Sequence, residues 1–300
     1  MKKVLVIGGS GFLGSHVADK LSDNGYQVSI FDIAKSDYLR NDQKMIIGSI
    51  SDNKLLDSSI NGMDIVYHFA GIADIKESTL DPIETMNINV MCTMQIIDLC
   101  VKYNVNRFMY ASTIYVYSNH GSFYKTSKQC SELIIENYVK SFDIKATIMR
   151  FGSLYGTRAN HFNSIKKMII QAISVGKIVR TGDGEEVRDY IHISDAAETS
   201  VRLLDSITDI EYVMITGNQT YKIKDIVNMI NEMMNNKLEI IYTKDSLKEH
   251  YHITPYNFKP NIAKKYNIDY NHDLGQGILE SIYNIYEELK NKDDRKSKDQ

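Results

Sequence analysis

The sequence is poor in the features that mark several large classes of protein. Its three cysteines, Cys92, Cys100 and Cys130, are an odd number without metal-ligand spacing, which argues against a disulfide framework and against a metal site. No segment approaches the ~20 apolar residues of a membrane-spanning helix. The apolar run after Met1 ends at Gly8, too early for a signal peptide. We therefore expect a cytoplasmic protein that binds no metal and no membrane.

The sequence also lacks a large excess of either charge sign. The chain of 300 residues has 35 basic and 38 acidic side chains, for a net charge of −3, so we expect no nucleic-acid partner. An apolar share of 43% and a charged share of 24% are ordinary for a globular protein. This length is sufficient for one large domain or two modest domains.

The most informative stretch comes first, from Lys2 to Asp32. The unbroken apolar run Val4–Ile7 is typical of a parallel strand that is buried on both faces. Three glycines follow at positions 8, 11 and 14, then apolar residues at helical spacing and a stop at Asn24-Gly25. A second apolar stretch ends in Asp32. The pattern predicts a strand, a glycine loop, a helix and a second strand with an acidic tip.

Each part of this unit suits the binding of a dinucleotide. Gly8, Gly11 and Gly14 let the backbone turn sharply and approach a pyrophosphate without a Cβ in the way. The helix N-terminus offers N–H groups and the positive end of its dipole to that anion. Asp32 can accept hydrogen bonds from a ribose diol and repels a 2′-phosphate, so NAD is favoured over NADP. Lys35, three residues further on, is the competitor for such a phosphate.

Strands and helices alternate as far as residue 150, which predicts an α/β fold with a doubly wound parallel sheet. Asp81-Pro82 should begin a helix over 81–104, and a second long helix is expected over 125–140. Beyond Arg150 the pattern is looser and mixed, which we interpret as a smaller substrate lobe over 151–290, interleaved with domain 1–150. Residues 291–300 are charged and lack aliphatic side chains, so we expect a disordered tail.

A tyrosine and a lysine four residues apart, Tyr124 and Lys128, form the second informative pattern. At a helix start they lie on one face. A free tyrosine has a pKa of about 10, and a neighbouring ammonium lowers that pKa by favouring the phenolate. Thr113, at the end of the preceding strand, can bond to the same substrate oxygen. The spacing alone occurs by chance in many helices, but behind a glycine loop it predicts a catalytic tyrosine.

With these motifs the sequence resembles the extended short-chain dehydrogenase/reductase family, within its nucleotide-sugar epimerase/dehydratase group and most of all the UDP-galactose 4-epimerases. The resemblance covers the chain to about residue 290. It rests on GGSGFLGS (8–15), Asp32, HFAG (68–71), NVMCT (89–93), YASTIYVYS (110–118), YKTSK (124–128), RFGSLYG (150–156) and GDGEEVRDYIHISD (182–195).

The resemblance implies a Rossmann-type domain that binds NAD and a smaller lobe that binds a nucleotide-diphosphate sugar. Thr113, Tyr124 and Lys128 would be the catalytic residues. The residues that would hold NAD are Gly8, Gly11, Phe12, Leu13, Gly14, Asp32, Ser49, Ile50, Phe69, Ala70, Gly71, Asn89, Ser112, Tyr124 and Lys128. The substrate would contact Ser153, Asn163 and Arg188, with the Arg188 guanidinium on the pyrophosphate.

The sequence departs from the family pattern at several positions. Only six residues separate Tyr117 from Tyr124, where relatives have a longer loop that forms part of the substrate pocket. Cys92 replaces a glycine of the NVxGT motif. Ser49 and Ser153 stand where an aspartate and an asparagine are usual. These changes leave the identity of the sugar and the nucleotide open, whereas the prediction of NAD as the cofactor is unaffected.

The residues after Thr113 bear on the reaction. Dehydratases of this family carry Asp-Glu there, an acid and a base for the elimination of water, whereas this chain has Ile114 and Tyr115. We therefore favour 4-epimerisation through a transient 4-keto sugar. A nucleotide-sugar 4-ketoreductase or dehydrogenase is the alternative. A dinucleotide-binding sensor or scaffold is a third, against which the complete set of catalytic residues argues.

Oligomeric state is the last expectation. The predicted helices carry more apolar residues than one sheet-facing side needs, among them Ile88, Met91, Ile96, Leu99, Cys100, Cys130, Leu133, Ile134 and Tyr138. In the family these helices pair across a two-fold axis, so a homodimer is expected. The alternative is a monomer in which loops cover the extra apolar groups.

Overall fold

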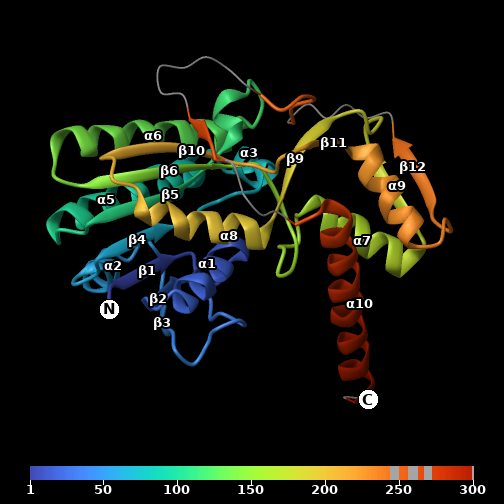
Figure 1. Cartoon of the computed structure of the whole chain (residues 1–300), viewed down its shortest axis with the longest axis horizontal. Coiled ribbons are helices and arrows are strands. Elements are labelled where there is room, and N and C mark those ends of the chain that lie inside the picture. Colours follow the sequence, from blue (N-terminus) through green and yellow to red (C-terminus); the bar gives the residue numbers. More distant parts are fainter. Residues whose placement is uncertain (244–249, 256–262, 267–271, 299–300) are drawn as a thin grey trace. The chain divides into compact units, whose positions relative to one another are not determined.

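The computed structural model describes residues 1–243, 250–255, 263–266 and 272–298, and the side chains up to 291 (Figure 1). The chain divides into two compact units. Unit 1 comprises residues 1–152, 196–216 and 255–267, and unit 2 comprises residues 153–195, 217–254 and 268–300. The first crossing follows Gly152, beside the boundary expected at residue 150, and two later segments belong to unit 1.

Unit 1 is built on one sheet of eight parallel strands in the order β13-β10-β6-β5-β4-β1-β2-β3. The strands are β1 (Lys3–Ile7), β2 (Gln27–Asp32), β3 (Lys44–Ile47), β4 (Ile65–His68), β5 (Arg107–Thr113), β6 (Lys145–Phe151), β10 (Ile210–Ile215) and β13 (Lys264–Lys265). The order reverses between β1 and β4, and in open α/β sheets ligands bind outside the carboxyl ends of the strands at such a point. The predicted doubly wound sheet is confirmed. The β10 strand lies within 151–290, the range expected to form the substrate lobe, but it pairs with β6 in unit 1.

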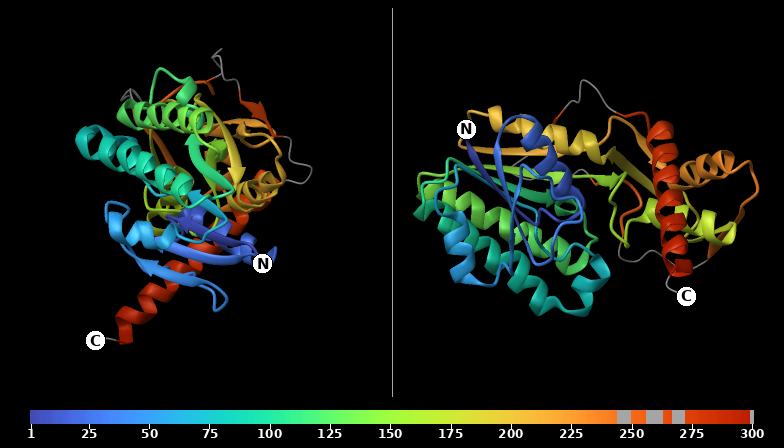
Figure 2. Two further views of the ribbon diagram at one scale, coloured as in Figure 1. Left: turned by 90° about the vertical axis from the view of Figure 1, so that its left-hand side faces the viewer. Right: turned by 90° about the horizontal axis from the view of Figure 1, so that it is seen from below.

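Helices cover both faces of this sheet (Figures 1 and 2). The helical segments of unit 1 are α1 (Phe12–Asp23), α2 (Asn53–Ile60), α3 (Ile75–Leu80), α4 (Pro82–Met86), the π-turn η1 (Asn87–Met91), α5 (Cys92–Lys102), the 3₁₀ turn η2 (Ile114–Tyr117), α6 (Ser122–Ser141), α8 (Ile193–Arg202, in unit 1 from Ala196) and the 3₁₀ turn η3 (Leu203–Asp205). The α1 and α8 helices share one face, where Lys20 and Glu198 form an ion pair at 3.5 Å.

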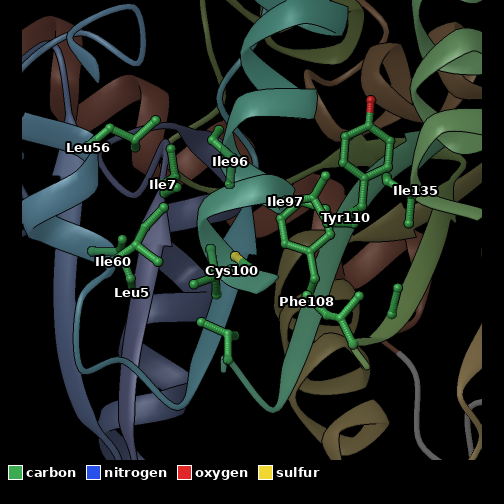
Figure 3. Packing of buried hydrophobic residues seen from close by; sticks show 14 of the residues in the cluster. Leu5, Ile7, Leu56, Ile60, Ile96, Ile97, Cys100, Phe108, Tyr110 and Ile135 are labelled. Carbon is green, nitrogen blue, oxygen red and sulfur yellow. The ribbon is translucent and has the colours of Figure 1, made fainter. Parts of the chain in front are cut away.

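The opposite face of the sheet holds a hydrophobic core (Figure 3). Leu5 and Ile7 of β1, Leu56 of α2 and Ile96 of α5 are fully buried there, together with Phe108 of β5. Residues Val4–Ile7 have no exposed surface, as expected for a central strand with helices on both faces. This core supports the strand ends that carry the candidate site.

The predicted helix over 81–104 is present but not regular. Asp81 caps it, accepting from the Glu84 amide at 3.0 Å, and Pro82 is its first residue, as the sequence indicates. Between α4 and α5 one π-turn intervenes, in which the Cys92 amide donates to the Asn87 carbonyl. The carbonyl of Asn89, at the centre of this turn, accepts from the hydroxyls of Thr93 and Ser131. The helix therefore carries one extra residue at Asn87–Met91.

Unit 2 has two small sheets, one of β11, β9 and β7 and one of β12 and β8. Its elements are β7 (Ser153–Tyr155), α7 (Ser164–Val175), β8 (Lys177–Thr181), β9 (Val187–His192), β11 (Thr220–Lys222), α9 (Ile223–Met233), β12 (Glu239–Thr243) and α10 (Leu274–Lys298). Ile169, Ile226 and Ile278 of the three helices are fully buried in its core.

The carboxyl end of the chain differs from expectation. We predicted a disordered tail from residue 291, but α10 continues to Lys298. Lysine and arginine are good helix formers, and adding residues to an existing helix is easier than starting one. Within the described residues, no helix combines the length and the apolar character needed to cross a membrane.

Candidate active site

The glycine loop between β1 and α1 is folded tightly on itself. The Gly8 amide donates to the Phe31 carbonyl at 2.8 Å, and the Gly11 amide donates to the Gly8 carbonyl at 3.2 Å. Gly8 has a φ of +81°, and a Cβ there would lie 2.4 Å from the Ala70 nitrogen. A Cβ on Gly14 would lie 2.2 Å from the Gly8 carbonyl oxygen. Packing of the chain itself therefore requires Gly8 and Gly14.

Gly11 differs, because the described protein leaves space beside it. Gly11 is exposed. Among the described residues, a Cβ on Gly11 would have one heavy atom within 4 Å, the Gly8 carbonyl oxygen at 3.2 Å. Gly11 precedes α1 without a side-chain cap, so the first-turn amides of Phe12 and Leu13 lack intrahelical acceptors. Open space, free donors and the positive end of a helix together fit a pyrophosphate.

Asp32 ends β2 beside this loop. Its Oδ2 accepts from the Ser10 amide at 2.9 Å, and its Oδ1 accepts from the Ala34 amide at 3.2 Å. The Ser10 hydroxyl donates to the Ala34 carbonyl at 2.8 Å, which ties the two loops together. The carboxylate is thus fixed in place and keeps lone pairs for a ribose diol.

We expect protein stripped of cofactor to bind NAD more tightly than NADP. The fixed Asp32 carboxylate repels a 2′-phosphate, and a repulsion of about 1.4 kcal/mol corresponds to roughly a tenfold preference. Calorimetric titration with both dinucleotides measures this, and Asp32→Asn should reduce the preference. Tighter binding of NADP by the unmodified protein would show that the exposed Lys35 dominates.

The loop after β4 contains Phe69, Ala70 and Gly71, and Asn89 of η1 holds it. The Asn89 Oδ1 accepts from the Ile72 amide at 2.8 Å, and its Nδ2 donates to the Ile72 carbonyl at 2.9 Å. Asn89 is buried. Its side chain therefore acts by shaping the loop that follows Gly71, rather than as an open ligand contact.

The two predicted contacts after β3 lie in different environments. Ser49 is exposed, and its hydroxyl accepts from the Ser51 amide at 3.1 Å. Ile50 is buried in the core and supports this turn from below. Cys92, which replaces the usual glycine, lies against the same turn with its Sγ 3.8 Å from the Ser51 hydroxyl. Of the two, Ser49 is the residue available to a ligand.

The three predicted catalytic residues meet in unit 1. Thr113 ends β5, Tyr124 lies in the first turn of α6, and their side chains are close enough to interact. The Lys128 ammonium donates to the Ala111 carbonyl at 2.8 Å and lies 4.8 Å from the centre of the Tyr110 ring. An ammonium has three donors, so Lys128 keeps two for a ligand.

Burial shifts the acidity of both catalytic groups. Burial raises the pKa of Tyr124 to about 12, and the hydrogen bond with Thr113 opposes that rise. Burial also lowers the pKa of Lys128 to about 8, while Glu132 raises it. We expected a neighbouring ammonium to lower the pKa of Tyr124, but in the protein burial is the larger effect. The positive ring of bound NAD⁺ would again favour the phenolate.

Ser112 and His68 have partners within the protein. The Ser112 hydroxyl donates to Glu132 at 2.5 Å, and Glu132 forms an ion pair with Arg150 at 2.6 Å. Sequence reasoning did not predict this buried network. The only local signal is that Glu132 follows Lys128 by one helical turn. His68, interpreted as a structural residue, lies with its Nε2 2.9 Å from Thr93 Oγ1, and burial lowers its pKa to about 3.

The short connection before Tyr124 is a tight turn. Gly121 has a φ of +99°, and a Cβ there would lie 2.7 Å from the Tyr115 ring. The Ser78 hydroxyl accepts from the Tyr124 amide at 3.2 Å, and Thr79 bonds Ser122 at 2.9 Å. The α3 helix therefore holds the start of α6, where relatives have a longer loop.

Unit 2 carries the predicted substrate residues. The Arg188 guanidinium lies 4.3 Å from the centre of the Tyr251 ring, and the Tyr251 side chain also interacts with Ser153. Tyr251 therefore contacts two of the three predicted substrate residues, Arg188 and Ser153. Asn163 instead caps α7, and its Nδ2 donates to the Leu154 carbonyl at 2.8 Å. Its amide is thus used within the protein.

A dinucleotide loop, an acidic strand tip and a Thr-Tyr-Lys set on one parallel sheet define an enzyme of the short-chain dehydrogenase/reductase class. More particularly, the chain belongs to the NAD dependent epimerase/dehydratase family, whose model matches residues 4–215. The resemblance read from the motifs is confirmed, and so is NAD as the cofactor.

Known proteins with similar sequences include both epimerases and decarboxylases. A Methanocaldococcus jannaschii protein, provisionally named a UDP-glucose 4-epimerase, is 29% identical over 83% of this chain and 88% of its own. The UDP-N-acetyl-alpha-D-glucosaminuronate decarboxylase of Bacillus cytotoxicus is 26% identical over 88% of this chain and 90% of its own.

The fold is also that of a solved epimerase. The UDP-glucose 4-epimerase of Thermotoga maritima, crystallised with UDP-glucose, superposes with a TM-score of 0.83 over 96% of this chain and 99% of its own, at 21% identity.

Proposed function

We propose that this enzyme is a nucleotide-sugar 4-epimerase that acts through a transient 4-keto sugar. The observation that carries the proposal is the meeting of the Thr113 and Tyr124 side chains, with the Lys128 ammonium one turn further along α6. Unit 1 would then be the NAD-binding domain. Unit 2 would supply the nucleotide-sugar lobe, with Arg188 and Ser153 as its contacts.

Each catalytic residue has a role that follows from its chemistry. The Tyr124 phenolate removes the proton of the C4 hydroxyl, and Thr113 donates a hydrogen bond to the same oxygen. Lys128 stabilises the phenolate by its charge and has donors left for the nicotinamide ribose. NAD held by the glycine loop, Asp32 and Lys128 would supply reversible hydride transfer at C4. Tyr124 then gives its proton back to the C4 oxygen.

The residues after Thr113 favour epimerisation over water elimination. Ile114 is buried and has no ionisable group. The Tyr115 ring packs edge-on against Tyr124 with centroids 6.4 Å apart, and a tyrosine hydroxyl is a poor acid or base near neutral pH. The pair therefore lacks the acid and the base that dehydration requires. Decarboxylation, the reaction named for one relative, is the other outcome to test.

A nucleotide-sugar panel tests the proposal. Purified protein is denatured and its supernatant assayed for NAD, and native protein is then incubated with UDP-sugars without added cofactor. A C4 epimer as product supports the proposal. Net formation or consumption of NADH would identify a dehydrogenase or ketoreductase, and release of CO₂ a decarboxylase. Bound NAD without any turnover would point to a sensor or scaffold.

We also propose that the protein is a homodimer through α6 and the neighbouring η1. Leu133 of α6 is 60% exposed and Met91 of η1 is 46% exposed, whereas Ile96 and Cys100 are fully buried in the core. The apolar surface is therefore narrower than the sequence suggested. A self-complementary contact of this kind is the commonest route to a dimer.

Leu133→Lys should weaken the dimer by at least about tenfold, because it places two like charges across a two-fold contact. Ile134, which the sequence suggested for this test, is half-buried and therefore less suitable. The matched control is Leu279→Lys on α10 in unit 2, where the leucine is 49% exposed. Light scattering across a dilution series measures both. An unmodified protein that is monomeric at micromolar concentration would contradict the proposal.

A further inference from the structure

A buried ion pair lies one helical turn beyond Lys128. The Glu132 carboxylate accepts from Arg150 twice, from Nε to Oε1 at 3.0 Å and from Nη2 to Oε2 at 2.6 Å. Its Oε1 also accepts from the Ser112 hydroxyl at 2.5 Å. The side chains of Glu132 and Arg150 are 9% and 3% exposed. Such a bidentate pair fixes geometry as well as charge.

Arg150 is enclosed on its other side. Its Nη1 donates to the Tyr117 hydroxyl, which also accepts from the Ala263 amide at 3.1 Å. The guanidinium lies 4.8 Å from the centre of the Tyr117 ring and 5.0 Å from that of Tyr212. Arg150 is therefore held in one place and in turn holds the Glu132 carboxylate.

The network joins the two elements that carry the catalytic residues. Tyr124, Lys128 and Glu132 recur every four residues on α6, so they share one face. Ser112 directly precedes Thr113 on β5 and lies opposite Arg150 on β6 in the sheet register. The Glu132 carboxylate thus connects the helix of Tyr124 and Lys128 to the strand of Thr113.

Stability alone does not account for this pair. Removing two charges from water is costly, and well-packed apolar residues in place of a buried ion pair often preserve or increase stability. The charges around Lys128 are a second reason to expect that the ion pair has a role beyond stability. It faces the Tyr110 ring and the Ala111 carbonyl of β5, neutral His68 of β4, and Tyr124 and Glu132 of its own helix. Of these groups, Glu132 is the anion, and Arg150 is the next cation behind it.

We propose that Glu132 is a positioning residue for the reaction, which orients Thr113 through Ser112 and keeps the Lys128 ammonium charged beside Tyr124. The expected effect of Glu132 on turnover rests on the proposed function, whereas its expected effect on the Lys128 ammonium is independent of that function. Without Glu132, Lys128 loses the anion that favours its charged form, and the ammonium gives up its proton at a lower pH. Tyr124 then loses the cation that favours its phenolate.

The first measurement needs no substrate. The Lys128 ammonium is followed by nitrogen NMR of labelled lysine side chains through a pH titration, with its signal assigned by its loss in Lys128→Arg. Glu132→Gln should move the titration midpoint to lower pH. Glu136→Gln, one turn further along α6, where Glu136 pairs with Lys140 and Tyr212, should leave it unchanged. An unchanged midpoint in Glu132→Gln would overturn the proposal, whatever the enzyme turns over.

The second measurement uses the sugar that the panel identifies. Glu132→Gln should lower kcat by between about tenfold and a hundredfold, within the range that misplaced catalytic groups cause, with a smaller change in KM. The alkaline limb of the kcat profile should move to lower pH, and Glu132→Asp should recover part of both effects. A profile that matches the unmodified enzyme would refute the assignment.

A double variant separates this role from a purely structural one. Glu132→Met with Arg150→Met removes both buried charges and should fold even where the single variant does not. It should melt near the temperature of the unmodified protein and still show reduced kcat. Full recovery of kcat and of the pH profile in this variant would show that the pair serves only to hold the fold together.

Discussion

Tyr124→Phe should lower turnover by at least ~10²-fold, the range expected for the loss of a general acid–base group. The substitution removes the hydroxyl that interacts with Thr113 and leaves the ring in contact with Tyr115. Cofactor content should not change, because the glycine loop, Asp32 and Lys128 are untouched. Turnover and bound NAD are measured on the same preparation.

The matched control is Tyr115→Phe. It removes a hydroxyl from the aromatic partner of Tyr124 and keeps the ring pair, whose centroids are 6.4 Å apart. Its turnover should stay within a few-fold of the unmodified enzyme. Full activity of Tyr124→Phe would remove Tyr124 from the chemistry, and a loss in Tyr115→Phe as large as that in Tyr124→Phe would show that the assay reports the packing of this ring pair.

Gly11→Ala should cost at least about tenfold in NAD affinity without destabilising the cofactor-free fold. The new methyl group would enter the space left beside the helix N-terminus, where it contacts the Gly8 carbonyl at 3.2 Å and little else among the described residues. Gly14→Ala should instead damage both properties, because its methyl group would lie 2.2 Å from that carbonyl.

Calorimetric titration gives the affinities, and thermal melts without cofactor give the stabilities. The two variants add the same methyl group at positions three residues apart. Their comparison therefore separates a loss of space for the ligand from a clash within the chain. If Gly11→Ala binds NAD as tightly as the unmodified protein, the open space at Gly11 is not where the pyrophosphate lies.

Local patterns explain why the sequence predicts the first half of the fold well. The Val4–Ile7 strand, the glycine loop and Asp32 are consecutive, so spacing alone places them together. Tyr124 and Lys128 likewise belong to one helix turn. Thr113 joins them because it ends a neighbouring parallel strand, which the strand–helix alternation implies.

Long-range contacts explain what sequence reasoning missed. Nothing local shows that β10 leaves the later half of the chain to pair with β6, because its apolar run would suit either sheet. The ion pair of Glu132 with Arg150 spans 18 residues and two elements, so no spacing rule detects it.

The π-turn at Asn87–Met91 sets the rotational phase of the helix that follows it. Each residue of an α-helix turns the chain by about 100°, so one inserted residue rotates everything after it by that angle. With the insertion, Asn89 reaches the Ile72 backbone while Ile96 and Cys100 face the core. A regularly wound helix would satisfy one of these requirements and turn the other away. The irregularity therefore lets a single helix serve the loop after Gly71 and the core at the same time.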